Sequence, residues 1–95
     1  LAKHADDLCV IRSMQTDLPN HSQAFVQMHT GSFQFVRPSL GAWTLYGLGT
    51  ENANLPGFVT LNPPSDNGGA RNYGSAFLSS IFQATKIGTN QIPGF

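Results

Sequence analysis

The chain has 95 residues, enough for one small domain, and its 10 glycines and 6 prolines leave few positions for regular structure. Its formal net charge is zero, which argues against an electrostatic surface for nucleic acid or for an anionic membrane. No apolar run approaches the roughly 20 residues that a membrane-spanning helix needs. We therefore expect neither a nucleic-acid partner nor a membrane span.

The first residues, Leu1 to Asp7, include no initiator methionine and look like the last turns of a helix that is already under way. Charged residues make up only 11% of the chain, against about 25% in ordinary soluble domains. Between Leu18 and Thr50 the only formal charge is Arg37, so we expect this middle part to be covered by other protein. Residues 1–95 are accordingly predicted to be a single partial domain whose partner is the remainder of a longer parent chain.

The run from Leu8 to Ser13 is short, mostly apolar and rich in β-branched residues, which predicts a buried strand. Cys9 lies within this run and is expected to be buried as a small hydrophobic side chain. As the single cysteine it cannot form an internal disulfide.

A helix is predicted from about His21 to Thr30, with an apolar face that is formed by Ala24, Phe25 and Met28. Asn20 supplies an N-cap, Gln23 three residues later would complete a capping box, and Gly31 would end the helix. His29, near the helix end, is expected to pack or to cap.

A second helix is predicted from about Ser39 to Leu48, ending at Gly49, and Phe58 to Leu61 reads as a second short strand. A long polar loop and a weaker segment from Ser75 to Ile87 follow. We predict an α/β fold in which the runs 8–13 and 58–61 are parallel strands joined by crossover helices, with Phe25 and Met28 packed across them.

The polar cluster Asn20, His21 and Ser22 stands at the predicted start of the first helix. The first N–H groups of a helix have no partner within the helix and carry partial positive charge, so this position could hold a phosphate, a sulfate or a metal-bound water. The alternative is that Asn20 is only a cap. Arg37 and Arg71 are candidates to bind an anion, since guanidinium groups match tetrahedral oxyanions, although Arg37 could instead pair with Glu51.

The chain resembles an uncharacterised bacterial family of sulfatase-like proteins in the alkaline-phosphatase superfamily, known as domain-of-unknown-function family 1501. The motifs that carry this resemblance span most of positions 8 to 62, and the tail from Ala70 to Gln83 fits more loosely. They are Val10-Ile11-Arg12-Ser13-Met14, Asn20-His21, Thr30-Gly31, Arg37-Pro38-Ser39-Leu40-Gly41-Ala42-Trp43, Tyr46-Gly47-Leu48-Gly49-Thr50-Glu51-Asn52 and Asn54-Leu55-Pro56-Gly57-Phe58-Val59.

This resemblance implies a fragment of an alkaline-phosphatase-like fold, and it places Asn20, His21 and Ser22 in the nucleophile region. His21 would be a metal ligand, a base or a vestige of the site, and Arg37 and Arg71 would bind the substrate. The implied activity is metal-dependent hydrolysis of sulfate or phosphate esters in an exported bacterial protein.

No carboxylate cluster, His-x-x-x-His pair or Cys pair closes a metal site in this sequence. We therefore expect a divalent metal only in the full-length protein, and no hydrolase activity from the fragment alone. The alternative is a non-catalytic, exported binding or assembly module that keeps the same fold.

Overall fold

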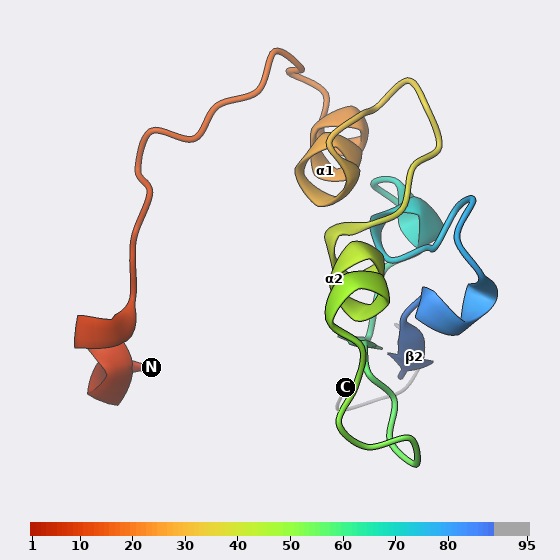
Figure 1. Ribbon diagram of the computed structural model, residues 1–95. Helices are drawn as coiled ribbons and strands as arrows, with labels where there is room; N and C mark the ends of the chain where they lie inside the picture. Colours follow the sequence, from red (N-terminus) through yellow and green to blue (C-terminus); the bar gives the residue numbers. More distant parts are fainter. Residues whose placement is uncertain (89–95) are drawn as a thin grey trace.

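The computed structural model describes residues 1–88 and contains helices and strands in one chain, so the fold is of the mixed α/β kind (Figure 1). Short 3-10 helices, written η, precede α1 and lie between the two strands. The order is η1 (Ala2–Asp7), α1 (His21–Thr30), α2 (Leu40–Leu48), β1 (Val59–Leu61), η2 (Gly69–Asn72), η3 (Ser80–Phe82) and β2 (Thr85–Ile87).

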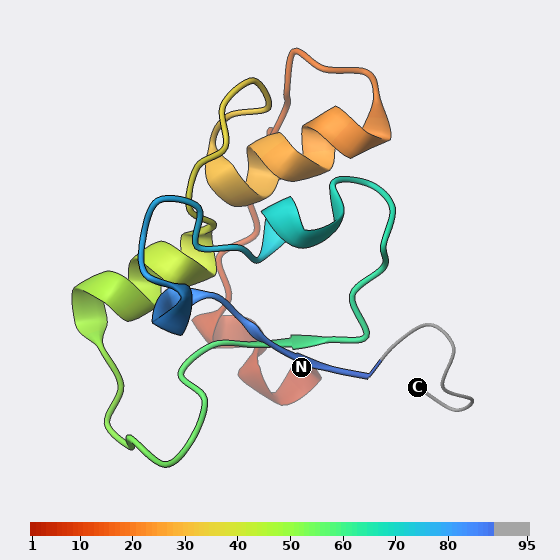
Figure 2. The same ribbon diagram turned by 90° about the vertical axis from the view of Figure 1, so that its right-hand side faces the viewer.

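The sheet consists of β1 and β2, which pair in parallel with Val59 opposite Thr85 and Leu61 opposite Ile87. Two further main-chain bonds extend the pairing: Thr85 N–H donates to the Phe58 carbonyl at 2.8 Å, and Asn62 N–H donates to the Ile87 carbonyl at 2.7 Å. The connection between the strands carries η2 and η3 (Figure 2). The predicted strand at 58–61 is confirmed, but its partner lies near the other end of the described chain.

The predicted strand at Leu8–Ser13 is wrong. This segment has no regular structure, and Val10 and Ile11 are 76% and 63% exposed. Figure 1 shows it as an extended arm between η1 and α1, away from the rest of the chain. Cys9 is exposed, so its predicted burial is wrong as well. An apolar run favours a strand, but it becomes one only where a neighbouring strand offers hydrogen bonds and other residues cover it.

The packing of α1 also differs from the prediction, because its buried residue is Val26 rather than Phe25 or Met28. Val26 is 2% exposed, whereas Phe25 is 40% and Met28 is 69% exposed. Helix α1 packs on η2 and not across the two strands. Since α1 and α2 both precede β1, they do not form the predicted crossover between paired strands.

The Asn20 cap and the Gly31 end of α1 match the prediction, but among the described residues no bond from the Gln23 side chain to the Asn20 N–H completes the predicted capping box. Asn20 has extended backbone angles and caps the first turn with its side chain, and Gly31 ends the helix in the left-handed conformation at φ 80°. The Gly31 N–H donates to the Gln27 carbonyl at 2.8 Å, and the Thr30 hydroxyl donates to the Val26 carbonyl at 2.8 Å.

Helix α2 begins one residue after its buried cap, Ser39, whose hydroxyl accepts from the Ala42 N–H at 3.3 Å. A glycine on its first turn, Gly41, lets α2 approach Phe58, because a Cβ at Gly41 would collide with the Phe58 ring. This contact brings the helix against the residue that leads into β1.

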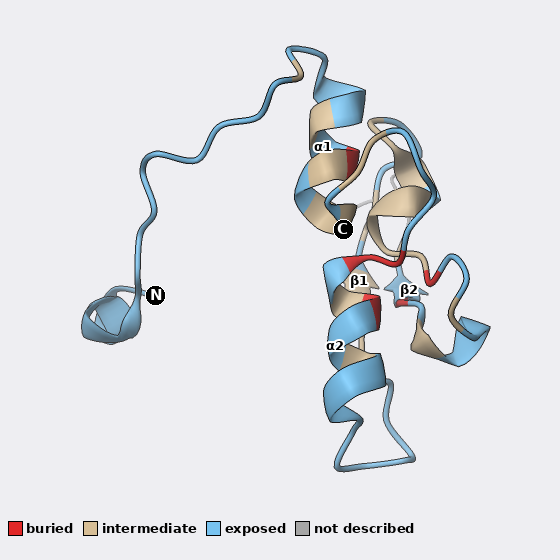
Figure 3. Cartoon of the chain, turned by 45° about the horizontal axis from the view of Figure 1, so that its top comes forward, coloured by how far each residue is buried: buried red, intermediate tan, exposed pale blue. Residues whose placement is uncertain are grey.

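The buried core is small (Figure 3) and is formed by side chains with little apolar surface. Its hydrophobic members are Val26, Ala42 and Ala84. Beside it, aromatic rings join α2 to the 77–82 segment: Trp43 meets Phe77 with ring centroids at 5.9 Å, and Tyr46 meets Phe82 at 5.3 Å, both edge to face. No helix among the described residues is long and apolar enough to cross a membrane.

Candidate functional site

The first turn of α1 is closed by Asn20. Its side-chain Oδ1 accepts from the N–H of Ser22 at 2.9 Å and of Gln23 at 3.4 Å, and its carbonyl accepts from the N–H of Ala24 at 2.9 Å. The Ala24 bond is the first ordinary bond of the helix, and two of the N–H groups that an incoming anion would use, those of Ser22 and Gln23, are already bonded to the cap. An anion could take the Ser22 and Gln23 N–H groups only by displacing the Asn20 side chain.

Ser22 points its hydroxyl toward another part of the chain. Its Oγ donates to Oδ1 of Asn67, in the loop before η2, at 3.3 Å. This bond joins the start of α1 to a loop 45 residues away in sequence. As arranged here, Ser22 tethers the loop, and it would have to break that bond before it could act as a nucleophile.

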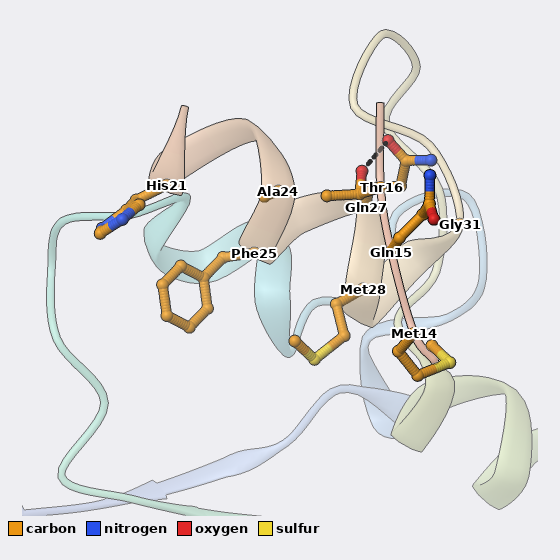
Figure 4. Close-up of a pocket in the computed structure, with 9 residues that line it drawn as sticks. All are labelled: Met14, Gln15, Thr16, His21, Ala24, Phe25, Gln27, Met28 and Gly31. Carbon is orange, nitrogen blue, oxygen red and sulfur yellow. Dashed lines mark hydrogen bonds between the residues drawn. The ribbon is translucent and has the colours of Figure 1, made fainter. Parts of the chain in front are cut away.

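His21 lines a groove of about 610 Å³ along one side of α1 (Figure 4). The helix contributes residues one turn apart on the same face, and the extended segment 14–16 forms the opposite rim. The two sides are tied by the Thr16 hydroxyl, which donates to Oε1 of Gln27 at 3.3 Å. The other lining residues are Met14, Gln15, Ala24, Phe25, Met28 and Gly31, so no Asp, Glu, Lys or Arg side chain lines the groove.

Arg71 and Arg37 lie outside this groove, so the described structure does not bring the candidate anion-binding residues together with His21. Nη2 of Arg71 donates to the carbonyls of Phe33 at 3.2 Å and Phe35 at 3.0 Å, which fixes the loop after α1 against η2. The Arg37 guanidinium carbon lies 5.6 Å from the centre of the Phe35 ring. Arg37 is exposed, and within residues 1–88 it has no ion pair with Glu51.

His29 has a structural role, in line with the sequence prediction. Its Nδ1 lies 2.8 Å from the Phe25 carbonyl, one turn back, and its ring stacks on the Phe25 ring with centroids at 6.5 Å. Because a carbonyl can only accept, Nδ1 carries the proton in the neutral ring.

A family profile described as "Protein of unknown function (DUF1501)" matches residues 1–94. The chain belongs to the DUF1501 family. Comparison with curated proteins and with solved structures gives no match. The DUF1501 match covers the polar cluster Asn20, His21 and Ser22 and the candidate anion-binding residues Arg37 and Arg71. All candidate site residues therefore lie inside the family region.

The described part of this DUF1501 chain does not form a metal site by itself. Among residues 1–88, no three His, Cys, Asp or Glu side chains come together in a way that could hold a metal ion. A catalytic zinc site uses three protein ligands, and a catalytic site for another divalent metal needs a comparable number of ligands. At most, His21 is one ligand of a larger set.

Sequence reasoning missed two contacts that connect α1 to other segments of the DUF1501 chain. Asn67, which receives the Ser22 hydroxyl, could have been noted because it opens an Asn-Gly-Gly turn. The contact between Thr16 and Gln27 has no signal in the sequence, because both are ordinary polar residues and only the path of the chain brings them together.

Proposed function

We propose that this chain is a segment of a metal-dependent hydrolase of sulfate or phosphate esters, and that it is inactive in isolation. The observation that carries the proposal is the position of His21, which stands exposed on the first turn of a capped helix with its ring beside a groove. The resemblance of the chain to sulfatase-like proteins of the alkaline-phosphatase superfamily supports the same assignment.

The residues of this chain would position groups rather than complete a reaction centre. Asn20 fixes the start of α1, and His21 would then be held in place as a metal ligand or as a proton acceptor. Metal ligands beyond His21 would come from the remainder of the parent chain, and we assign no reaction step through the metal.

The two arginines differ in how readily they could bind the substrate. Arg37 rests one face of its guanidinium near Phe35, which leaves the N–H edge available to an oxyanion. Arg71 already uses Nη2 on two carbonyls. Arg37 is therefore the better candidate for a substrate contact, and Arg71 is the better candidate for holding the loop.

The test compares His21→Ala with His29→Ala in the full-length protein. His21 is exposed on the first turn, so its removal should lower sulfatase or phosphatase turnover, or metal content, with little change in melting temperature. His29 stacks on Phe25, so its removal should lower the melting temperature and leave turnover nearly unchanged. The proposal fails if the two variants lose activity and metal content equally.

A second candidate is an exported, non-catalytic binding or assembly module with the same fold. The apolar, uncharged lining of the groove beside His21 favours this function, because exposed apolar patches often mark contacts between proteins. The two candidates differ in one observable. A catalytic parent protein should carry Asp and His residues outside this segment that can complete a metal site, whereas the assembly module needs none.

A further inference from the structure

An Asn-Gly pair lies where the loop before η2 meets the first turn of α1. Asn67, Gly68 and Gly69 all have left-handed backbone angles, with φ of 50°, 96° and 51°. The Asn67 side chain accepts the Ser22 hydroxyl at 3.3 Å, and the Asn67 carbonyl accepts from Nδ2 of Asn72 at 2.9 Å. The side chain of Asn67 thus holds the loop against α1, and its main-chain carbonyl bonds the loop to the end of η2.

We propose that Asn67 is a modification site, at which the folded protein loses the side-chain amide through a cyclic imide formed with Gly68. The main-chain nitrogen of Gly68 attacks Cγ of Asn67, a new N–C bond forms, and the Cγ–Nδ2 bond breaks. The amide nitrogen leaves as ammonia and takes with it the proton of the Gly68 nitrogen. Water is the only other reactant, and nothing is oxidised or reduced.

Water then opens the imide ring at one of its two carbonyls. Attack at the former side-chain carbonyl gives aspartate with a normal main chain. Attack at the other carbonyl gives isoaspartate, in which the main chain runs through the side-chain carbons. Both products carry a carboxylate where Asn67 had a neutral amide.

Three features of the structure favour this reaction at Asn67. Gly68 has no Cβ to shield its nitrogen, and among the described residues its N–H donates no hydrogen bond. The Ser22 hydroxyl polarises the side-chain carbonyl of Asn67, which makes Cγ a better electrophile. By contrast, Asn52 and Asn54 are followed by Ala53 and Leu55, whose side chains crowd the attacking nitrogen.

The modification would change the charge of the candidate site. The new carboxylate would stand within hydrogen-bond distance of Ser22, next to His21 in sequence. Negative charge at the start of a helix is favoured by the helix dipole, so the aspartate form should remain folded. The same charge would repel a sulfate or phosphate group at that position. The reaction itself does not depend on the proposed function.

The test incubates the full-length protein at mildly alkaline pH, folded and in denaturant, and follows each asparagine by peptide fragmentation mass spectrometry. In the folded protein, Asn67 should convert to aspartate and isoaspartate several-fold faster than Asn52 or Asn54, which lie in the same tryptic peptide. Conversion of Asn67 at the rate of Asn54, or conversion only in denaturant, would overturn the proposal.

Two variants sharpen this test. Asn67→Gln should abolish the fast conversion, because the longer side chain would have to form a six-membered ring. Ser22→Ala should slow conversion in the folded protein but not in denaturant, since the hydroxyl contact exists only in the fold. Equal slowing in both conditions would contradict the role given to Ser22. Gly68 is left intact because a Cβ there would collide with the Val26 side chain.

Discussion

At the scale of single residues, the start of α1 shows how one side chain can limit what a helix end can bind. Asn20 occupies the N–H groups of Ser22 and Gln23, so the helix dipole has an internal partner before any ligand arrives. The sequence allowed both a cap and an anion site. The structure shows the cap, and a role for His21 must therefore come from its ring rather than from free N–H groups at the helix start.

The capping role of Asn20 leads to a prediction about stability. Asn20→Ala should lower the free energy of unfolding by about 1 kcal/mol, because the Ser22 and Gln23 N–H groups lose their acceptor. Asn20→Asp is the matched control and should keep nearly all of the stability, since a carboxylate caps as well as an amide. Chemical denaturation of the three proteins measures the difference. An Asn20→Asp loss as large as that of Asn20→Ala would contradict the assignment.

At the scale of elements, the two helices and the strand β1 could be predicted, whereas the strand that pairs with β1 could not. Helices α1 and α2 depend on nearby residues, with Asn20 and Gly31 marking one and Ser39 and Gly49 marking the other. A strand depends on a distant partner. Two of the three residues in Thr85–Ile87 are β-branched and suit a strand, but the segment is too short to show an alternating pattern, and only its pairing with β1 makes it a strand.

The same distinction between local and distant determinants applies to the candidate site. The Asn20 cap joins residues two and three positions apart, and it was predicted from the sequence. Arg71 was considered as an anion ligand, but it binds carbonyls 36 and 38 residues away, which only the folded path of the chain brings near. Sequence spacing therefore identifies the cap and leaves the role of the arginine undetermined.

The close approach of α2 to Phe58 can be tested with two glycines of the same helix. Gly41→Ala should destabilise the protein by about 1–3 kcal/mol, because the new methyl group would collide with the Phe58 ring. Gly47→Ala is the control: a Cβ there meets nothing within 4 Å, so alanine should stabilise α2 by up to about 1 kcal/mol. Thermal unfolding measures both, and stabilisation by Gly41→Ala would show that α2 does not approach Phe58.

At the scale of the whole molecule, the described chain buries little apolar surface and brings few potential metal ligands together. We expect the 95-residue segment alone to hydrolyse neither aryl sulfates nor aryl phosphates in the presence of divalent metals, because the described residues form no metal site. The measurement is turnover of the purified segment. Activity that survives repurification and disappears in His21→Ala would contradict this expectation.

The exposed apolar side chains lead to a prediction about association. Phe25 and Met28 are 40% and 69% exposed on the same face of α1, and Met14 across the groove is 73% exposed. Apolar surface of this kind binds hydrophobic dyes and promotes self-association unless other protein covers it. The isolated segment should therefore bind such a dye and associate as its concentration rises, and Met28→Gln should weaken both. Leu48→Gln is the control, because Leu48 is 85% exposed but lies outside the groove.

If the full-length protein covers this groove, as the partial-domain prediction requires, Met28→Gln should destabilise that protein more than Leu48→Gln does. Equal effects of the two substitutions there would indicate that the groove stays open.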